Sequence, residues 1–204
     1  MASGDTALGI CSDALLMIGA KAISSFTEGT DSANICASLF EDIKKQSLMQ
    51  YPWTFSFKKV QVARLATTPT TEYTYEYQLP SDRIGPPRQV FISNTAGQRP
   101  INAYRILQDK LLTNETTVYV DYQYDVEPFE MPTYFVQFLK YYMAWHLSLP
   151  ITDQTDKAAY WQSVAVGTPG ENGRGGYFRT AISIDGQTQP NNYIDDYSLI
   201  EVRN

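Results

Sequence analysis

The hydrophobic period of the chain changes in the middle of one run, between residues 117 and 150. The run first alternates as TVYVDYQYDV, which places on one face of a strand Val118, Val120, Tyr122 and Tyr124. After PFEM the period becomes helical, through Phe135, Phe138, Leu139, Tyr142 and Leu149. This change predicts a boundary between a β module and a helical module, and it limits the folds that the chain can adopt.

Two helical segments precede the β region. The first is predicted over residues 6–19. The second begins at Thr30 or Asp31, either of which is a good N-cap. It stops before Tyr51, because the residue ahead of a proline disfavours helical geometry.

Two more helical segments follow the β region. The third helix is predicted over residues 132–148, with Pro150 ending it. The fourth begins near Thr152 or Asp153 and runs through Val164. The connection between these two helices is therefore short, which is typical of antiparallel neighbours in a bundle.

Residues 54–125 have the pattern of short strands separated by turn-rich segments. The candidate strands are FSFKKVQVARL, EYTYEYQL, RQVFIS, YRIL, KLL and VYVDYQY. Gln108-Asp109 separates YRIL from KLL, which predicts a tight hairpin. Short strands of this number favour a small antiparallel sandwich or barrel.

The C-terminal part begins with GTPGENGRGG, a segment predicted to be neither helix nor strand. The polar sequence that follows still carries apolar residues, namely Tyr193, Ile194, Tyr197, Leu199 and Ile200. A purely disordered tail would not need these residues. We therefore expect an arm that orders against another subunit or partner. The alternative is a strand folded back on its own domain.

Together these segments predict an α+β fold. It is an antiparallel four-helix bundle with a small antiparallel β domain inserted between helices 2 and 3, plus an extended C-terminal arm. The expected parts are helices 1 and 2 (residues 1–53), the β domain (54–127), helices 3 and 4 (128–168), and a Gly-rich loop with the arm (169–204).

Few residues fit a catalytic or metal site. His146 is the only histidine, and a single histidine cannot build a metal centre by itself. Asp121 and Asp125 share a face of their strand, where carboxylates commonly protect a solvated edge. The glycines after residue 169 have the order G-x-x-G-x-G-G and follow a helix, unlike a dinucleotide fingerprint. We therefore expect that the protein is not an enzyme and that it binds neither a cofactor nor a metal ion.

Composition restricts the partners. The net charge of −6 argues against a protein that grips nucleic acid by neutralising phosphates. No apolar stretch reaches the length of a membrane span, so no membrane partner is expected. The 15 tyrosines suit strands, and they also suit contact surfaces. Cys11 and Cys36 fit small buried hydrophobic residues.

Four segments, in order, resemble one known family. LGICSDALLMIGAKAISSFTEGTDSANICASLF has a helix ending in I-G, an I-S-S loop and E-G-T before a second helix. YPWTFSFKKVQVARL carries P-W-x-F, and YTYEYQLPSDRIGPPRQV carries Y-x-Y-x-L-P-x-D. VYVDYQYDVEPFEMPTYFVQFLKYYMAWHLSLPIT passes from a strand into a P-x-x-F helix that ends in L-P-I-T. Over roughly residues 8–165 the chain resembles the tail tubular protein A family, the head-to-tail adaptors of short-tailed, podovirus-type phages.

The resemblance implies a structural virion protein without enzymatic activity, assembled in the host cytoplasm and located in the virion neck. Members of that family form a ring of twelve subunits beneath the portal protein. Their β end meets a nozzle of the tail tubular protein B type, with tail fibres attached nearby. Genomic DNA passes through the bore without sequence-specific binding. The chain departs from the family at GTPGENGRGG, where the fourth helix usually continues. RTAISIDGQTQP is similar to the end of the family's last helix.

Two sets of residues are predicted to form the contacts. The portal or neighbour-subunit interface comprises Arg174, Tyr177, Phe178, Arg179, Tyr193, Ile194, Tyr197, Leu199 and Ile200. The nozzle-facing β surface comprises Tyr73, Tyr75, Tyr77 and Arg83.

Two other functions remain open from the sequence. One is a carbohydrate- or receptor-binding tail module that uses its tyrosine faces. The other is a hydrolase that uses the carboxylates of Asp121 and Asp125.

Overall fold

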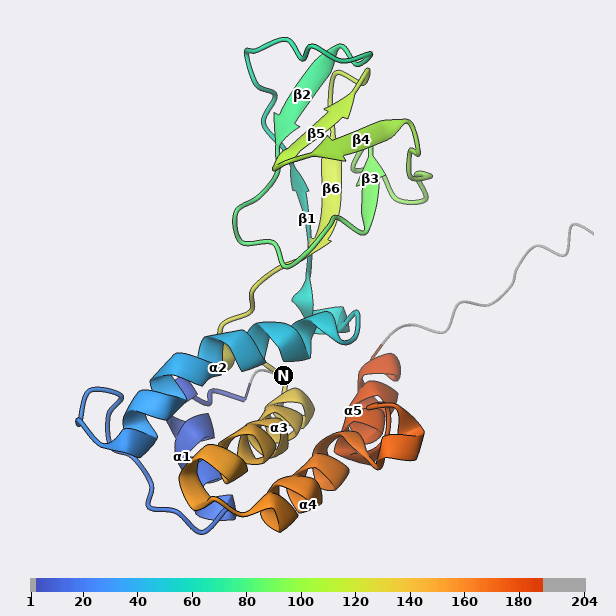
Figure 1. Cartoon of the computed structure of the whole chain (residues 1–204). Coiled ribbons are helices and arrows are strands. Elements are labelled where there is room, and N and C mark those ends of the chain that lie inside the picture. Colours follow the sequence, from blue (N-terminus) through green and yellow to red (C-terminus); the bar gives the residue numbers. More distant parts are fainter. Residues whose placement is uncertain (1–2, 189–204) are drawn as a thin grey trace, which may run out of the picture.

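The computed structural model describes residues 3–188. Helices α1 (Ala7–Met17) and α2 (Asp31–Met49) come first, and the strands follow them. Helices α3 (Thr133–Thr152), α4 (Thr155–Val166) and α5 (Gly176–Gly186) come last. Figure 1 shows the helices gathered at one end of the molecule and the strands at the other. The described part of the chain is therefore an α+β structure.

The strands form two antiparallel sheets of three strands each. One sheet has the order β1-β6-β3, from β1 (Phe57–Gln61), β6 (Tyr119–Gln123) and β3 (Gln89–Phe91). The other has the order β2-β5-β4, from β2 (Tyr75–Gln78), β5 (Lys110–Thr113) and β4 (Tyr104–Leu107). The predicted hairpin at Gln108-Asp109 is confirmed, and Gln108 takes the positive φ of 54° that so short a turn requires.

The sheets enclose a small hydrophobic core of their own. Of the four residues predicted to share one face, Val118, Val120 and Tyr122 are buried in this core, whereas Tyr124, just after β6, is only half-buried. Tyr77 of β2 is also buried in this core and donates a hydrogen bond to the carbonyl oxygen of Glu115 at 2.6 Å. Burial of alternate residues along β6 fixes the register of its pairs with β1 and β3.

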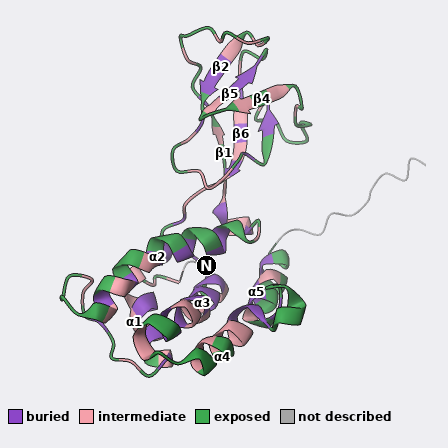
Figure 2. Cartoon of the chain, in the orientation of Figure 1, coloured by how far each residue is buried: buried purple, intermediate pink, exposed green. Residues whose placement is uncertain are grey.

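The helices surround a second, larger core in which α3 is the central element (Figures 1 and 2). Aromatic rings meet here: the ring of Trp53 lies 5.0 Å from that of Phe135 and 5.9 Å from that of Phe178. The indole N–H of Trp53 donates to the Ser47 carbonyl oxygen at 3.1 Å. Trp53 therefore fixes the chain at the point where it leaves α2 for the strands.

Helix α3 does not stop at Pro150 as predicted. Proline removes one backbone N–H donor, but two other hydrogen bonds complete the last turn of the helix after it. The Thr152 hydroxyl donates to the Ser148 carbonyl oxygen at 2.6 Å, and the Asp153 N–H donates to that of Leu149 at 3.0 Å. The helix then ends at Asp153, which has a φ of 53°.

The prediction of a Gly-rich loop and extended arm over residues 169–204 is wrong for residues 176–186, which form α5. The glycines permit a close packing of the chain between α4 and α5. A Cβ on Gly176 would lie 2.6 Å from the Val164 carbonyl oxygen and 2.7 Å from the Gly167 nitrogen. The Gly175 N–H donates to the Val166 carbonyl oxygen at 2.9 Å. This segment is a tight connection between helices.

Helix α5 belongs to the core through Phe178, so we expect Phe178→Ala to destabilise the protein. The ring lies 5.1 Å from that of Phe138 and is almost completely buried. Its removal should lower the free energy of unfolding by about 3–5 kcal/mol, measured by urea unfolding. Arg179→Ala is the matched control, because the exposed Arg179 should cost less than about 0.5 kcal/mol. Equal, small effects of both changes would contradict the assignment of Phe178 to the core.

Candidate functional site

The structure offers no obvious centre for chemistry among residues 3–188. No group of three or more His, Cys, Asp or Glu side chains there is placed to hold a metal ion. None of the helices in that range is long and apolar enough to span a bilayer. His146 packs against Tyr142 and Trp145, and burial lowers its pKa. The junction between the helices and the strands, and the exposed face of the helices, carry the other candidate features.

Two neighbouring strands carry the chain across the junction. Phe57 at the start of β1 pairs with Gln123 at the end of β6, so the outgoing and returning segments lie side by side. The amide nitrogen of Gln123 donates to the Leu48 carbonyl oxygen at 2.7 Å and to that of Tyr51 at 3.2 Å. Leu48 lies in the last turn of α2, where the helix leaves acceptors unsatisfied, and Tyr51 follows just after the helix. Gln123 thus joins the sheet to the end of a helix.

A buried lysine makes the second connection. Lys44 of α2 lies 3.0 Å from Asp125, just past β6, and 2.9 Å from Glu41 of its own helix. Burial alone would lower the pKa of Lys44, but the two carboxylates outweigh it and raise that pKa above the ordinary value. Asp125 is therefore part of an ion pair that holds the returning strand against α2.

Asp185 makes the third connection, at the C-terminal end of α5. It is completely buried and accepts hydrogen bonds from the Thr54 backbone N–H at 3.0 Å and from the Thr54 hydroxyl at 2.9 Å. The Tyr134 hydroxyl donates to it at 2.6 Å. Burial, and then this bond to Asp185, raise the pKa of Tyr134. One carboxylate therefore ties α5 to α3 and to the segment that enters β1.

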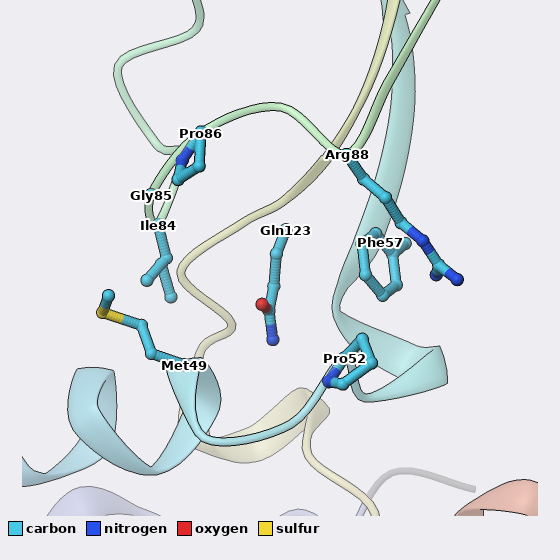
Figure 3. Close-up of a pocket in the computed structure, with 8 residues that line it drawn as sticks. All are labelled: Met49, Pro52, Phe57, Ile84, Gly85, Pro86, Arg88 and Gln123. Carbon is cyan, nitrogen blue, oxygen red and sulfur yellow. The ribbon is translucent and has the colours of Figure 1, made fainter. Parts of the chain in front are cut away.

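A shallow hollow of about 250 Å³ lies at this junction (Figure 3). The loop before β3 covers one side of it, with Ile84 and Pro86, while Met49 and Pro52 at the end of α2 form the other. Met49 is 60% exposed. Figure 3 shows Gln123 between these two walls.

The helices present a strip of partly exposed aromatic residues. Tyr141 of α3 stacks on Trp161 of α4 with ring centroids 5.9 Å apart, and meets Tyr177 of α5 edge-on at 5.4 Å. Tyr160 lies edge-on to Trp161 at 5.2 Å and is 60% exposed. We call Tyr141, Tyr160, Trp161 and Tyr177 the aromatic strip. Rigid aromatic side chains of this kind are enriched in protein interfaces.

The residues predicted for the portal or neighbour interface differ in how far they are buried. Arg174 and Arg179 are exposed and Tyr177 is half-buried in the aromatic strip. Phe178 is a correction, since it is buried in the helical core and is not a surface contact. The remaining five, Tyr193, Ile194, Tyr197, Leu199 and Ile200, lie outside the described residues.

The predicted nozzle-facing set is also divided. Tyr73 and Tyr75 are half-buried, and the Arg64 guanidinium lies 4.9 Å from the Tyr75 ring. Tyr77 is a second correction, because the sheets fold over it and bury it. Arg83 forms an ion pair with Asp109 at 2.6 Å.

Sequence reasoning missed Lys44, Gln123 and Asp185. Nothing in their spacing distinguishes them from surface residues, because their partners are remote in the chain. The aromatic strip had a weak signal in the several aromatic residues that fall on α3, α4 and α5.

No protein-family model matches the chain, and no curated protein is significantly similar to it in sequence.

We expect Asp185→Asn to loosen the junction. The amide keeps one acceptor oxygen but loses the charge that strengthens three hydrogen bonds, so the free energy of unfolding should fall by about 2 kcal/mol in urea unfolding. Asp42→Asn removes the same charge from an exposed site on α2 and should change stability by less than about 0.5 kcal/mol. A loss no larger than that of the control would show that the three bonds are dispensable.

Alkaline pH should weaken the sheet through Tyr122. Burial, and then the hydrogen bond to Asp82 at 2.9 Å, raise the pKa of Tyr122 to about 12. An unfolded tyrosine titrates near pH 10. The stabilising contribution is therefore complete below about pH 10 and is lost as pH rises towards 12.

Accordingly, unfolding free energies measured from pH 9 to 12 should fall less steeply for Tyr122→Phe than for the original chain. Tyr160→Phe, at an exposed site, should follow the original curve. Identical slopes for all three proteins would refute this role of Tyr122.

Proposed function

We propose that the protein is a structural head-to-tail adaptor of a short-tailed phage. In this proposal a ring of subunits joins the portal protein to the tail nozzle and surrounds the path of the DNA. The observation that carries the proposal is the ordered set of motifs over residues 8–165, whose spacing resembles the tail tubular protein A family. The proposed location is the neck of the virion, after assembly in the host cytoplasm, with tail fibres as further neighbours.

The proposed architecture is a bundle of the first four helices, residues 1–53 and 128–168, with residues 54–127 inserted between helices 2 and 3. The pairing of Phe57 with Gln123 supports it, because an inserted domain leaves and re-enters its host through adjacent segments. Two separate hydrophobic clusters also support it. Helix α5 then packs on the bundle as an additional element.

The junction is stiff, as a protein that holds two partners at a fixed distance and orientation needs to be. Gln123 and the Lys44–Asp125 pair hold the returning strand against α2, and Asp185 of α5 holds the segment that enters β1. Such ties limit rotation about the two connecting strands. A spacer between portal and nozzle needs this stiffness, whereas a binding module on a free linker does not.

The aromatic strip suits a contact with portal or neighbouring subunit. Tyr160 and Trp161 offer large rigid rings, and such residues dominate the binding energy of many interfaces. Ring closure needs head-to-tail contacts between unlike faces of the subunit. The negative charge of the chain would repel the DNA backbone and reduce adhesion during passage.

The competing proposal is a carbohydrate- or receptor-binding tail module. The half-buried Tyr73 and Tyr75 keep it open, but the burial of Tyr77 removes one ring from the proposed stacking face. Binding on a glycan array by a protein that ignores portal would favour this alternative.

The adaptor proposal predicts that Tyr160→Glu will block docking on portal. The substitution puts a charge on the most exposed ring of the aromatic strip, and loss of an interface anchor costs about 2 kcal/mol or roughly thirtyfold in affinity. Electron microscopy of portal mixed with the protein should show rings for the original chain and few for the variant.

Leu107→Glu is the matched control, since it places the same charge on an exposed apolar residue of the β module. It should leave docking on portal intact. Failure of the original chain to form rings on portal would overturn the proposed function, and unimpaired docking of Tyr160→Glu would overturn the role of the strip.

A further inference from the structure

A second hollow lies on the sheet formed by β2, β5 and β4. Its floor comes from one face of that sheet, since Glu76 pairs with Leu112, and Lys110 pairs with Leu107. The segment 69–71, which precedes β2, supplies a further part of the wall. The volume of the hollow, about 370 Å³, lies within the usual range for small-molecule pockets, about 300–1,000 Å³. A small ligand therefore fits here.

A charged carboxylate lies in this hollow. Glu76 is only 6% exposed, and its Oε1 atom accepts hydrogen bonds from the Thr67 hydroxyl and, at 3.0 Å, from the Lys110 ammonium group. The bond from Thr67, and then that from Lys110, lower the pKa of Glu76, so the carboxylate is ionised at neutral pH. Both bonds are to the same oxygen, and the Oε2 atom accepts none from a described residue. That second oxygen can accept hydrogen bonds from a ligand.

A buried hydroxyl in the wall has no partner. The Oγ1 atom of Thr71 is shielded from solvent and forms no hydrogen bond with any of residues 3–188. A polar atom in this state costs free energy, which a bound ligand can recover by supplying the missing hydrogen bond. Because Thr71 lines the hollow, a ligand inside it lies next to this hydroxyl.

The charges in the hollow favour a neutral ligand. Glu76 and Lys110 are the two charged residues that line it, and they neutralise each other at 3.0 Å. A charged ligand would leave the site with an unbalanced charge. The ammonium group of Lys110 uses one of its three donors on Glu76, so it can also donate to a ligand. Acceptor and donor thus lie side by side, next to the apolar side chains of Pro69, Leu107 and Leu112.

We propose that this hollow binds one neutral sugar ring, with its hydroxyl groups on the Glu76 carboxylate, the Lys110 ammonium group and the Thr71 hydroxyl. Each sugar hydroxyl can both donate and accept, so neighbouring hydroxyls of one ring satisfy the carboxylate and the ammonium group together. The C–H groups of the ring pack on Pro69 and Leu107.

The proposed activity is binding without hydrolysis. A glycosidase needs two carboxylates across one sugar bond, and Glu76 is the one carboxylate among the described residues that line the hollow. The tyrosines of the competing proposal, Tyr73 and Tyr75, do not line it either, so this is a different site. The inference goes beyond the proposed adaptor function and does not depend on it.

Titration of the full chain with D-glucose, D-galactose and D-mannose, followed by NMR of the backbone amides, tests the proposal. The three sugars differ in the arrangement of their hydroxyls around the ring. At least one of them should shift the amide signals of Thr71, Glu76 and Lys110 in a saturable way, with a dissociation constant on the order of 1 mM. The absence of saturable shifts at these positions with all three sugars would overturn the proposal.

Thr71→Val separates binding from folding. The substitution removes a hydroxyl that has no partner in the described part of the chain, so the urea midpoint should not fall. The affinity for the sugar should fall about tenfold, because one hydrogen bond to the ligand is lost. Thr116→Val is the matched control, at an exposed threonine of the same module that does not line the hollow. Unchanged affinity in Thr71→Val, or an equal loss in Thr116→Val, would contradict the assignment of the site.

Glu76→Gln tests the carboxylate. The amide keeps an oxygen for Thr67 and Lys110 but loses the charge that strengthens hydrogen bonds from the sugar, so the affinity should fall at least tenfold. Glu72→Gln removes the same charge from an exposed position outside the hollow and should bind the sugar as the original chain does. If Glu76→Gln also retained the original affinity, the sugar would not be bound by the carboxylate and the proposal would fail.

Discussion

A single buried carboxylate, that of Asp185, links the helices to the segment that enters the first strand. Asp185 lies at the end of α5, where the helix dipole disfavours a negative charge, yet it receives the N–H and hydroxyl of Thr54 and the hydroxyl of Tyr134. Hydrogen bonds to a charged group are stronger than neutral ones, and leaving such a group unpaired in the interior is costly. The carboxylate therefore fixes where the first strand departs from the helices.

The polar contacts at the junction restrict the orientation of the strands more than apolar packing would. Apolar contacts tolerate sliding, whereas hydrogen bonds and ion pairs require particular distances and angles. Gln123 and the Lys44–Asp125 pair act on the returning strand, and Asp185 acts on the outgoing one. Because both strands are held, the sheet cannot pivot on either. This directional control would suit the spacer between two large partners that we propose.

The sequence predicted the elements well where the hydrophobic period was long. Local patterns predicted the buried face of Val118, Val120 and Tyr122, the hairpin at Gln108-Asp109 and the N-cap at Thr30, which accepts from the Ala33 N–H at 3.3 Å. It failed at α5, because the glycines before that helix were interpreted as a loop that leads into an extended arm, whereas they allow two backbones to approach closely. The ties at the junction could not be predicted, since Thr54 and Asp185 are 131 residues apart and only the fold brings them together. The sequence also does not show which parts of the chain cover a residue, so Tyr77 and Phe178 were predicted to lie on surfaces although both are buried.

The two hydrophobic clusters described above share few side chains, and Tyr124 packs against both. Each cluster can therefore lose its packing without directly exposing the other. Heating is expected to melt the chain as two cooperative units, with a calorimetric enthalpy larger than the van't Hoff value for a single step. The polar contacts between the units then govern how closely the two transitions overlap.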